Sequence, residues 1–103
     1  MLIHELLDFA AKSGASDIHI SAGAIPALRI DGEIRKLDHP PLTSEEAKRI
    51  AYSVMNEKQK TIFENELELD FSIGLKGLAR FRINAFTHVN GVGMVLRFIP
   101  EKT

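Results

Sequence analysis

Two alternating segments joined by a turn signal constrain this chain more than any other feature. They cover residues 77–86 and 93–100, with Asn90-Gly91 between them. Asn-Gly is the pair best suited to a two-residue hairpin turn, because both central residues of that turn need a positive φ. Polar and apolar residues alternate along both segments, as they do in strands that bury one face. The sequence therefore predicts an antiparallel hairpin with one apolar and one polar side.

The register of this hairpin follows if Asn90-Gly91 forms the whole loop. Ile83 then lies opposite Phe98 on the apolar side, and a slip of one residue would scatter the arginines over both faces. The polar side of the predicted hairpin carries Arg80, Arg82, Asn84 and Arg97. In this register Arg82 lies diagonally across from Arg97, close enough for two long side chains to meet one anion. The hairpin thus has an apolar back and a cationic front.

Size and composition limit the remaining possibilities. The chain has 103 residues, enough for one domain with a single core. A net charge of −1 gives no general attraction to nucleic acid or to an anionic membrane, so any cationic site must be local. The absence of cysteine excludes disulfides, thiol chemistry and cysteine-ligated metals. The apolar N-terminal stretch is interrupted by His4, Glu5 and Asp8, which is unlike a signal peptide or membrane span, so we expect a cytoplasmic protein.

Three helices are predicted outside the hairpin. Apolar residues recur at helical spacing over residues 2–13. A second helix is expected after the N-cap Thr43, with Glu46 at the reciprocal position of a capping box. A third is expected after Asn56, with Gln59 at the equivalent position. The apolar positions assigned to the buried side of this third helix are Ile62, Phe63 and Leu67.

Further strands are predicted at residues 16–20, 27–30, 33–37 and 67–73. Asp31-Gly32 is a hairpin turn signal between the second and third of these, for which the expected core positions are Leu28, Ile30 and Ile34. Strands joined by tight turns form antiparallel sheets. The sequence therefore predicts an α+β fold with a mostly antiparallel sheet, helices packed on one face and the other face open.

Motifs for chemistry within the chain are absent or weak. It contains neither a GxxxxGK[ST] loop nor a GxGxxG after a strand, so it has no recognised cradle for a nucleoside triphosphate. The histidines show no metal-ligand spacing. Asp17 and His19 share one face of a strand, and are interpreted either as a surface polar pair or as a catalytic carboxylate–imidazole pair without a nucleophile. The acidic residues 64–70 straddle a helix end and a strand, which indicates a solvated face rather than a metal site.

The arginines allow two interpretations. They can be the wet side of a sheet, paired with Asp70 or Glu68 on the neighbouring strand. Alternatively they hold an anion, since guanidinium groups stay charged and bind phosphate in a bidentate manner. Without a phosphate loop in this chain, another domain or subunit would have to present that anion.

Four segments together resemble one protein family. They are residues 14–20 (GASDIHI), 30–33 (IDGE), 79–86 (ARFRINAF) and 96–100 (LRFIP). In this order they are similar to the N-terminal domain of the secretion and pilus ATPases, and among these to the PilT-like retraction motors of twitching motility. The resemblance covers essentially the whole chain.

The resemblance implies a PAS-like domain that precedes a RecA-like ATPase core in a homo-hexameric motor. In such motors ATP and Mg²⁺ lie between the two domains, and arginines of the N-terminal domain reach the phosphates. Matched residue by residue, Arg82 and Arg97 take the two arginine positions, with Arg80 as a secondary candidate on the same face. The implied location is cytoplasmic, against the inner-membrane platform of the pilus, with no membrane insertion and no nucleic-acid partner.

The family's motor core is expected to begin beyond Pro100, and its Walker motifs and catalytic glutamate do not occur in residues 1–103. The chain alone is therefore expected to be a single regulatory domain without ATPase activity. Its opening directly on the first helix favours a retraction motor over an assembly motor. The alternative is a stand-alone PAS-like module that binds a ligand or a partner protein through its sheet.

Overall fold

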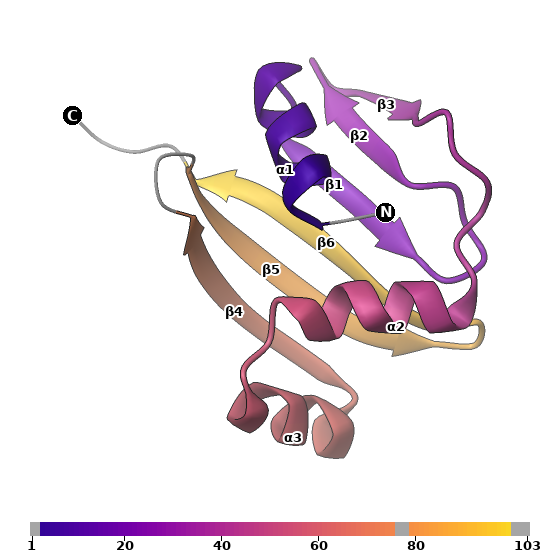
Figure 1. Ribbon diagram of the computed structural model, residues 1–103, viewed down its shortest axis with the longest axis vertical. Helices are drawn as coiled ribbons and strands as arrows, with labels where there is room; N and C mark the ends of the chain where they lie inside the picture. The colour runs from indigo at the N-terminus through magenta and orange to yellow at the C-terminus, as the bar shows by residue number, and fades with distance from the viewer. Residues whose placement is uncertain (1–2, 76–78, 100–103) are drawn as a thin grey trace.

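The computed structural model describes residues 3–75 and 79–99. Predicted features that fall on residues 1–2, 76–78 and 100–103 lie outside the described residues. The elements follow in the order α1 (Ile3–Lys12), β1 (Asp17–Ser21), β2 (Ala27–Ile30), β3 (Glu33–Lys36), α2 (Ser44–Ser53), α3 (Glu57–Glu66), β4 (Glu68–Leu75), β5 (Ala79–His88) and β6 (Gly91–Ile99) (Figure 1). None of the helices in the described residues is long and apolar enough to cross a membrane.

The strands form one six-stranded sheet in the order β3-β2-β1-β6-β5-β4, and each neighbouring pair is antiparallel. Figure 1 shows α1 and α2 over the same face of this sheet. The predicted α+β class, the antiparallel sheet and the one-sided helix layer are confirmed. Because β1 pairs with β6, the first and last strands of the chain lie side by side at the centre of the sheet.

Both central helices begin where their caps predict. The Thr43 hydroxyl accepts a hydrogen bond from the backbone N–H of Glu46 at 3.1 Å, and the Glu46 carboxylate accepts one from the N–H of Thr43 at 3.0 Å. Asn56 and Gln59 make the equivalent reciprocal pair at 2.8 and 2.9 Å. Each box satisfies backbone donors that have no partner within the first turn of a helix. These two starts therefore depend on local sequence alone.

The core lies between the helices and the covered face of the sheet. Phe81 and Phe98, directly opposite on β5 and β6, pack with their rings tilted by 57° and their ring centroids 4.5 Å apart. The largest fully buried apolar side chains include Leu7, Ile18, Ile20, Leu28, Leu42, Phe81, Ile83, Met94 and Leu96. Strands β1, β5 and β6 each contribute alternate residues to this core, which leaves the intervening residues on the opposite face.

Three predicted core positions are wrong. Ile34 is 52% exposed, since it lies opposite Arg29 on edge strand β3, on the face that the helices leave uncovered. Ile62 is 37% exposed, and Phe63 alone fills the buried side of α3. Leu67 is 57% exposed because it ends α3 in the left-handed conformation, with φ of 64°, instead of continuing the buried stripe.

The predicted register of the β5–β6 hairpin is also wrong, by two residues. His88 pairs with Gly91, so the loop is Val89-Asn90 instead of Asn90-Gly91. Ile83 therefore faces Leu96 and not Phe98. A slide of two residues keeps every side chain on its predicted face, because the pleat repeats every two residues. It also brings Arg82 directly opposite Arg97 instead of diagonal to it.

Close packing explains this register better than the turn signal does. Phe86 pairs with Gly93, and a Cβ at Gly93 would lie only 2.6 Å from the Phe86 ring. The predicted register would have placed Phe86 opposite a valine instead. At the loop itself, the Asn90 N–H donates to His88 Nδ1 at 3.2 Å. The Phe86 ring therefore requires a residue without a Cβ opposite it. Gly93 meets this requirement, and the loop moves to Val89-Asn90 as a result.

Candidate anion-binding face

Four charged residues form a row across the uncovered face of the sheet. From the middle of the sheet toward its β4 edge they lie on β1, β6, β5 and β4: Asp17, Arg97, Arg82 and Asp70. They occupy alternate positions to the buried core residues of the same strands, so the alternation that builds the core also places these charges outward. The row has the charge order minus, plus, plus, minus, and we refer to it as the charged row.

Arg82 contacts Asp70 through two nitrogens. Its Nη2 donates to Asp70 Oδ2 at 3.1 Å and its Nε donates to Oδ1 at 3.4 Å. Both side chains are exposed, at 65% for Arg82 and 51% for Asp70. The hydrogen bond from Arg82 lowers the pKa of Asp70, and the same contact raises the pKa of Arg82. Exposed pairs of this kind contribute little to stability.

Arg97 contacts a carboxylate of a different kind. Its Nη2 lies 3.5 Å from Oδ2 of Asp17, which is directly opposite on β1. The Asp17 side chain is only 7% exposed, whereas that of Arg97 is 67% exposed. Among the residues that the structure describes, Asp17 is the one charged residue that is buried. Arg97 is the ion-pair partner of this carboxylate, and burying a carboxylate without such a partner is costly.

The two arginines point toward opposite sides of the face. Arg82 is held toward β4 and Arg97 toward β1, and between them lies an open depression of about 340 Å³. Its lining residues are Asp70, Arg82, Asn84, Val95 and Arg97. Like charges directly opposite on neighbouring strands repel, and the flanking carboxylates offset that repulsion. The prediction that both arginines share one face is confirmed. The expected convergence of their side chains on one anion is not found, because each guanidinium is paired with a carboxylate on its outer side. Their binding of a phosphate stays a prediction.

Arg80 lies further along β5, opposite Ile99. A Cβ at Gly74 would lie 3.3 Å from its Nη1, so the guanidinium extends over β4 rather than toward Arg97. The structure thus separates Arg80 from the pair formed by Arg82 and Arg97.

Asp17 and His19 do not form the carboxylate–imidazole pair considered from the sequence. Asp17 contacts Arg97, and His19 Nε2 is buried without a hydrogen-bond partner among the described residues. The sequence could not identify Asp17 as the partner of Arg97, because the two lie 80 positions apart and the β1–β6 pairing is not visible in local patterns. The Asp70 partner of Arg82 was considered and is confirmed.

Members of the acidic run have separate partners. Glu64 accepts a hydrogen bond from the Tyr52 hydroxyl at 2.9 Å on the helical side, whereas Asp70 contacts Arg82 on the sheet. In the part of the chain that the structure describes, no group of His, Asp and Glu is arranged to hold a metal ion.

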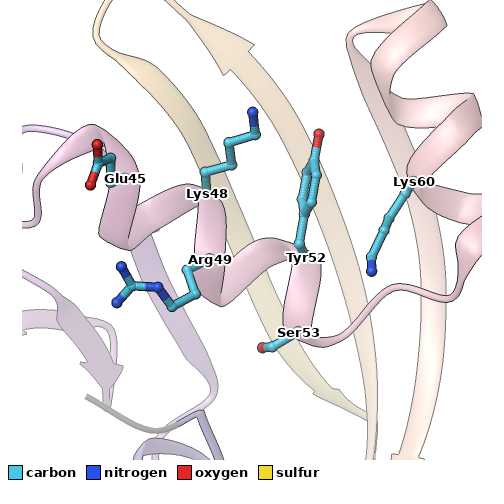
Figure 2. Close-up of a pocket in the computed structure, with 6 residues that line it drawn as sticks. All are labelled: Glu45, Lys48, Arg49, Tyr52, Ser53 and Lys60. Atoms are coloured by element: carbon cyan, nitrogen blue, oxygen red, sulfur yellow. The ribbon is translucent and has the colours of Figure 1, made fainter.

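A second cationic surface, not found from the sequence, lies on α2 and α3 (Figure 2). Lys48 Nζ lies 5.4 Å and Lys60 Nζ 5.9 Å from the centre of the Tyr52 ring, in an open groove of about 560 Å³ that Arg49 also lines. Burial and the Glu64 hydrogen bond raise the pKa of Tyr52. Lys60 also pairs with Glu57 at 3.2 Å, so part of this charge is neutralised locally.

The sequence is similar to those of known pilus ATPases. The chain is 50% identical over 102 residues to the type IV pilus retraction ATPase PilT of Pseudomonas aeruginosa, covering 99% of this chain and 30% of that protein. It is 37% identical over 99 residues to the type IV pilus ATPase PilU of the same organism, covering 96% of this chain and 26% of PilU. No protein-family model matches the sequence.

Among solved structures, the crystal structure of the pilus retraction motor PilT with bound ADP superposes with a TM-score of 0.90 at 46% identity. The match covers 99% of this chain and 30% of that one. The fold and its uncovered face thus define an α+β domain of the kind present in pilus motors. Over nearly its whole length the chain corresponds to the N-terminal region, about 100 residues, of PilT-family type IV pilus and secretion ATPases. It spans about 30% of the length of these relatives.

Proposed function

We propose that this chain is the N-terminal regulatory domain, residues 1–103, of a hexameric type IV pilus retraction ATPase. In this proposal a RecA-like core supplies the Walker motifs, binds ATP with Mg²⁺ and performs the hydrolysis. The domain contributes Arg82 and Arg97 to the nucleotide phosphates and contacts the core and neighbouring subunits. The assembled motor works in the cytoplasm against the inner-membrane platform of the pilus.

One observation carries this proposal. Arg82 and Arg97 lie directly opposite on β5 and β6, on a sheet face that no helix of the described chain covers. Both side chains are about two-thirds exposed, so a nucleotide presented by another domain has access to them. The match to a motor structure that contains ADP supports a nucleotide as the anion that this face would bind.

The chemistry suits phosphoryl transfer. Charge accumulates on the phosphate oxygens as the terminal phosphoryl group leaves, and guanidinium groups stabilise that charge through bidentate hydrogen bonds. Such contacts act chiefly in the transition state and depend on donors that are already in place. The sheet fixes the backbone positions of both arginines on adjacent strands, so that only their side chains have to turn toward a phosphate.

The proposal is tested in the full-length motor with Arg82→Ala and Arg97→Ala. We expect the ATPase rate to fall by about 100-fold in each variant, the effect of removing one transition-state donor. Arg35→Ala is the matched control, because Arg35 forms an exposed pair with Glu33 on edge strand β3. Arg80→Ala is expected to have a smaller effect, because its guanidinium lies over Gly74. Normal turnover in both Arg82→Ala and Arg97→Ala would defeat the proposal.

The alternative of a free-standing ligand-binding module has weaker support. The depressions on the sheet and on α2–α3 are open surfaces rather than enclosed cavities. A small ligand is normally bound in a site that encloses most of its surface. An open cationic face is better suited to an anion that another domain holds on its other side.

A further inference from the structure

The charged row assigns different partners to the two arginines, and these partners differ in how easily they can be replaced. Asp70 is 51% exposed and Asp17 is 7% exposed, although both carboxylates contact exposed guanidinium groups. A carboxylate that loses its arginine must be solvated by water or remain unpaired. Asp70 can be solvated where it stands, whereas Asp17 cannot.

The Arg82 contact has the features of an exchangeable pair. Both of its side chains are exposed, and exposed ion pairs contribute little to stability. Asp70 uses the Nε and Nη2 edge of the guanidinium. A carboxylate and a phosphate present the same pair of oxygens to this edge, so they compete for it directly.

The Arg97 contact is no shorter, at 3.5 Å, and differs instead in the burial of its carboxylate, which is 7% exposed. Release of Asp17 would break the ion pair that this buried carboxylate makes in the structure, which is unfavourable unless Arg29, directly opposite on β2, replaces Arg97. A guanidinium has five donors, however, and Asp17 contacts only Nη2 of Arg97. Arg97 therefore has further donors with which to meet a phosphate while it remains bound to Asp17.

We propose that Asp70 is an internal competitor that occupies Arg82 until a polyphosphate displaces it, whereas Asp17 is a positioning residue that holds Arg97 in place throughout. The inference rests on the proposed function of the two arginines and adds its regulation. Arg82 is the arginine that changes partner, and Arg97 is the one that stays. When the phosphate leaves, Arg82 returns to Asp70 on β4. The Arg82–Asp70 contact therefore reports whether a nucleotide phosphate is bound.

The test measures binding of inorganic tripolyphosphate to the 103-residue chain, with the Nε–H signals of its arginines followed by NMR. In the wild type we expect the Arg82 signal to shift and exchange on titration, while the backbone of β1 near Asp17 is unchanged. Asp70→Asn is expected to bind about two- to fivefold more tightly, the range that corresponds to removing an exposed ion pair as competitor. Asp17→Asn is expected to bind more weakly, with Arg97 no longer held in one orientation.

Asp8→Asn is the matched control, because Asp8 forms an exposed pair with Lys12 on α1, and the variant loses the same charge away from the sheet. Tighter binding by both Asp8→Asn and Asp70→Asn would reduce the effect to net charge and overturn the inference. Equal or weaker binding by Asp70→Asn would overturn it as well, and so would the absence of binding in both wild type and Asp70→Asn.

Failure here is distinguishable from failure of the proposed function. If Asp70→Asn leaves binding unchanged but Arg82→Ala and Arg97→Ala still abolish turnover in the full-length motor, only the competition is wrong. Should Asp17→Asn unfold, the Asp70 comparison and the wild-type titration decide the inference by themselves.

Discussion

The two faces of the β5–β6 pair are built from the same strands but differ in role: one is buried in the core and the other is exposed and charged. On the covered face, Phe81 and Ile83 are fully buried against Leu96 and the helices. On the uncovered face, Arg82 and Arg97 are exposed and form ion pairs with the flanking carboxylates. Burial makes the first face the source of stability, since apolar area removed from water is the main favourable term in folding. The second face contributes less to stability and is accessible for binding. A substitution there should therefore lower the free energy of unfolding less than one on the covered face.

The largest effect is expected on the covered face. Phe81→Ala removes a fully buried ring that packs against Phe98, and should lower the free energy of unfolding by about 3–5 kcal/mol. Chemical denaturation followed by circular dichroism measures this. A loss comparable to that of an exposed residue would contradict the assignment of the core to this face.

A smaller effect should distinguish the two arginines within the uncovered face. Arg97→Ala leaves the buried carboxylate of Asp17 without its partner and should destabilise the chain by about 1–2 kcal/mol. Arg82→Ala leaves Asp70 in water, and we expect no measurable change in its unfolding midpoint. The same denaturation experiment compares them, and equal losses would remove the distinction on which the exchange of Arg82 depends.

The smallest effect concerns pH. Because Arg82 lowers the pKa of Asp70, this carboxylate contributes stability that is fully present above its unfolded pKa, near 4. The contribution is lost as the pH falls through the lower pKa of the folded state. The wild type should thus lose slightly more stability than Asp70→Asn when the pH is lowered from 7 to about 2.5. Glu46, whose pKa is lowered by its hydrogen bonds with Thr43, contributes equally in both proteins and cancels. Parallel curves for the two proteins would show that the Arg82 contact is not populated in solution.

Local patterns predicted those parts of the fold that depend on neighbours in sequence. The helix starts at Thr43 and Asn56 follow from reciprocal hydrogen bonds across three residues. The Asp31-Gly32 turn is confirmed, with φ of 51° and 80° at its two residues and Ile30 paired with Glu33. Each of these features is satisfied by residues within a few positions of one another, and packing elsewhere in the described chain does not override it.

Predictions that required knowledge of distant neighbours were less successful. Ile34 was assigned to the core on its hydrophobicity, but it lies at an edge on the face that no helix covers. The Asn90-Gly91 turn signal was overridden because the Phe86 ring needs the space above Gly93. Turn propensity is a weak preference, and contacts between fully packed side chains outweigh it.

The sequence by itself determined which residues of the two strands share a face, because side chains alternate with a period of two whatever the register. It thus placed Arg80, Arg82 and Arg97 together on the side away from the core. Only the tertiary structure decided that Arg82 lies directly opposite Arg97, and that β1 brings Asp17 beside Arg97. The pairing of the first strand with the last is set by how the whole core packs, and so is the burial that separates Asp17 from Asp70.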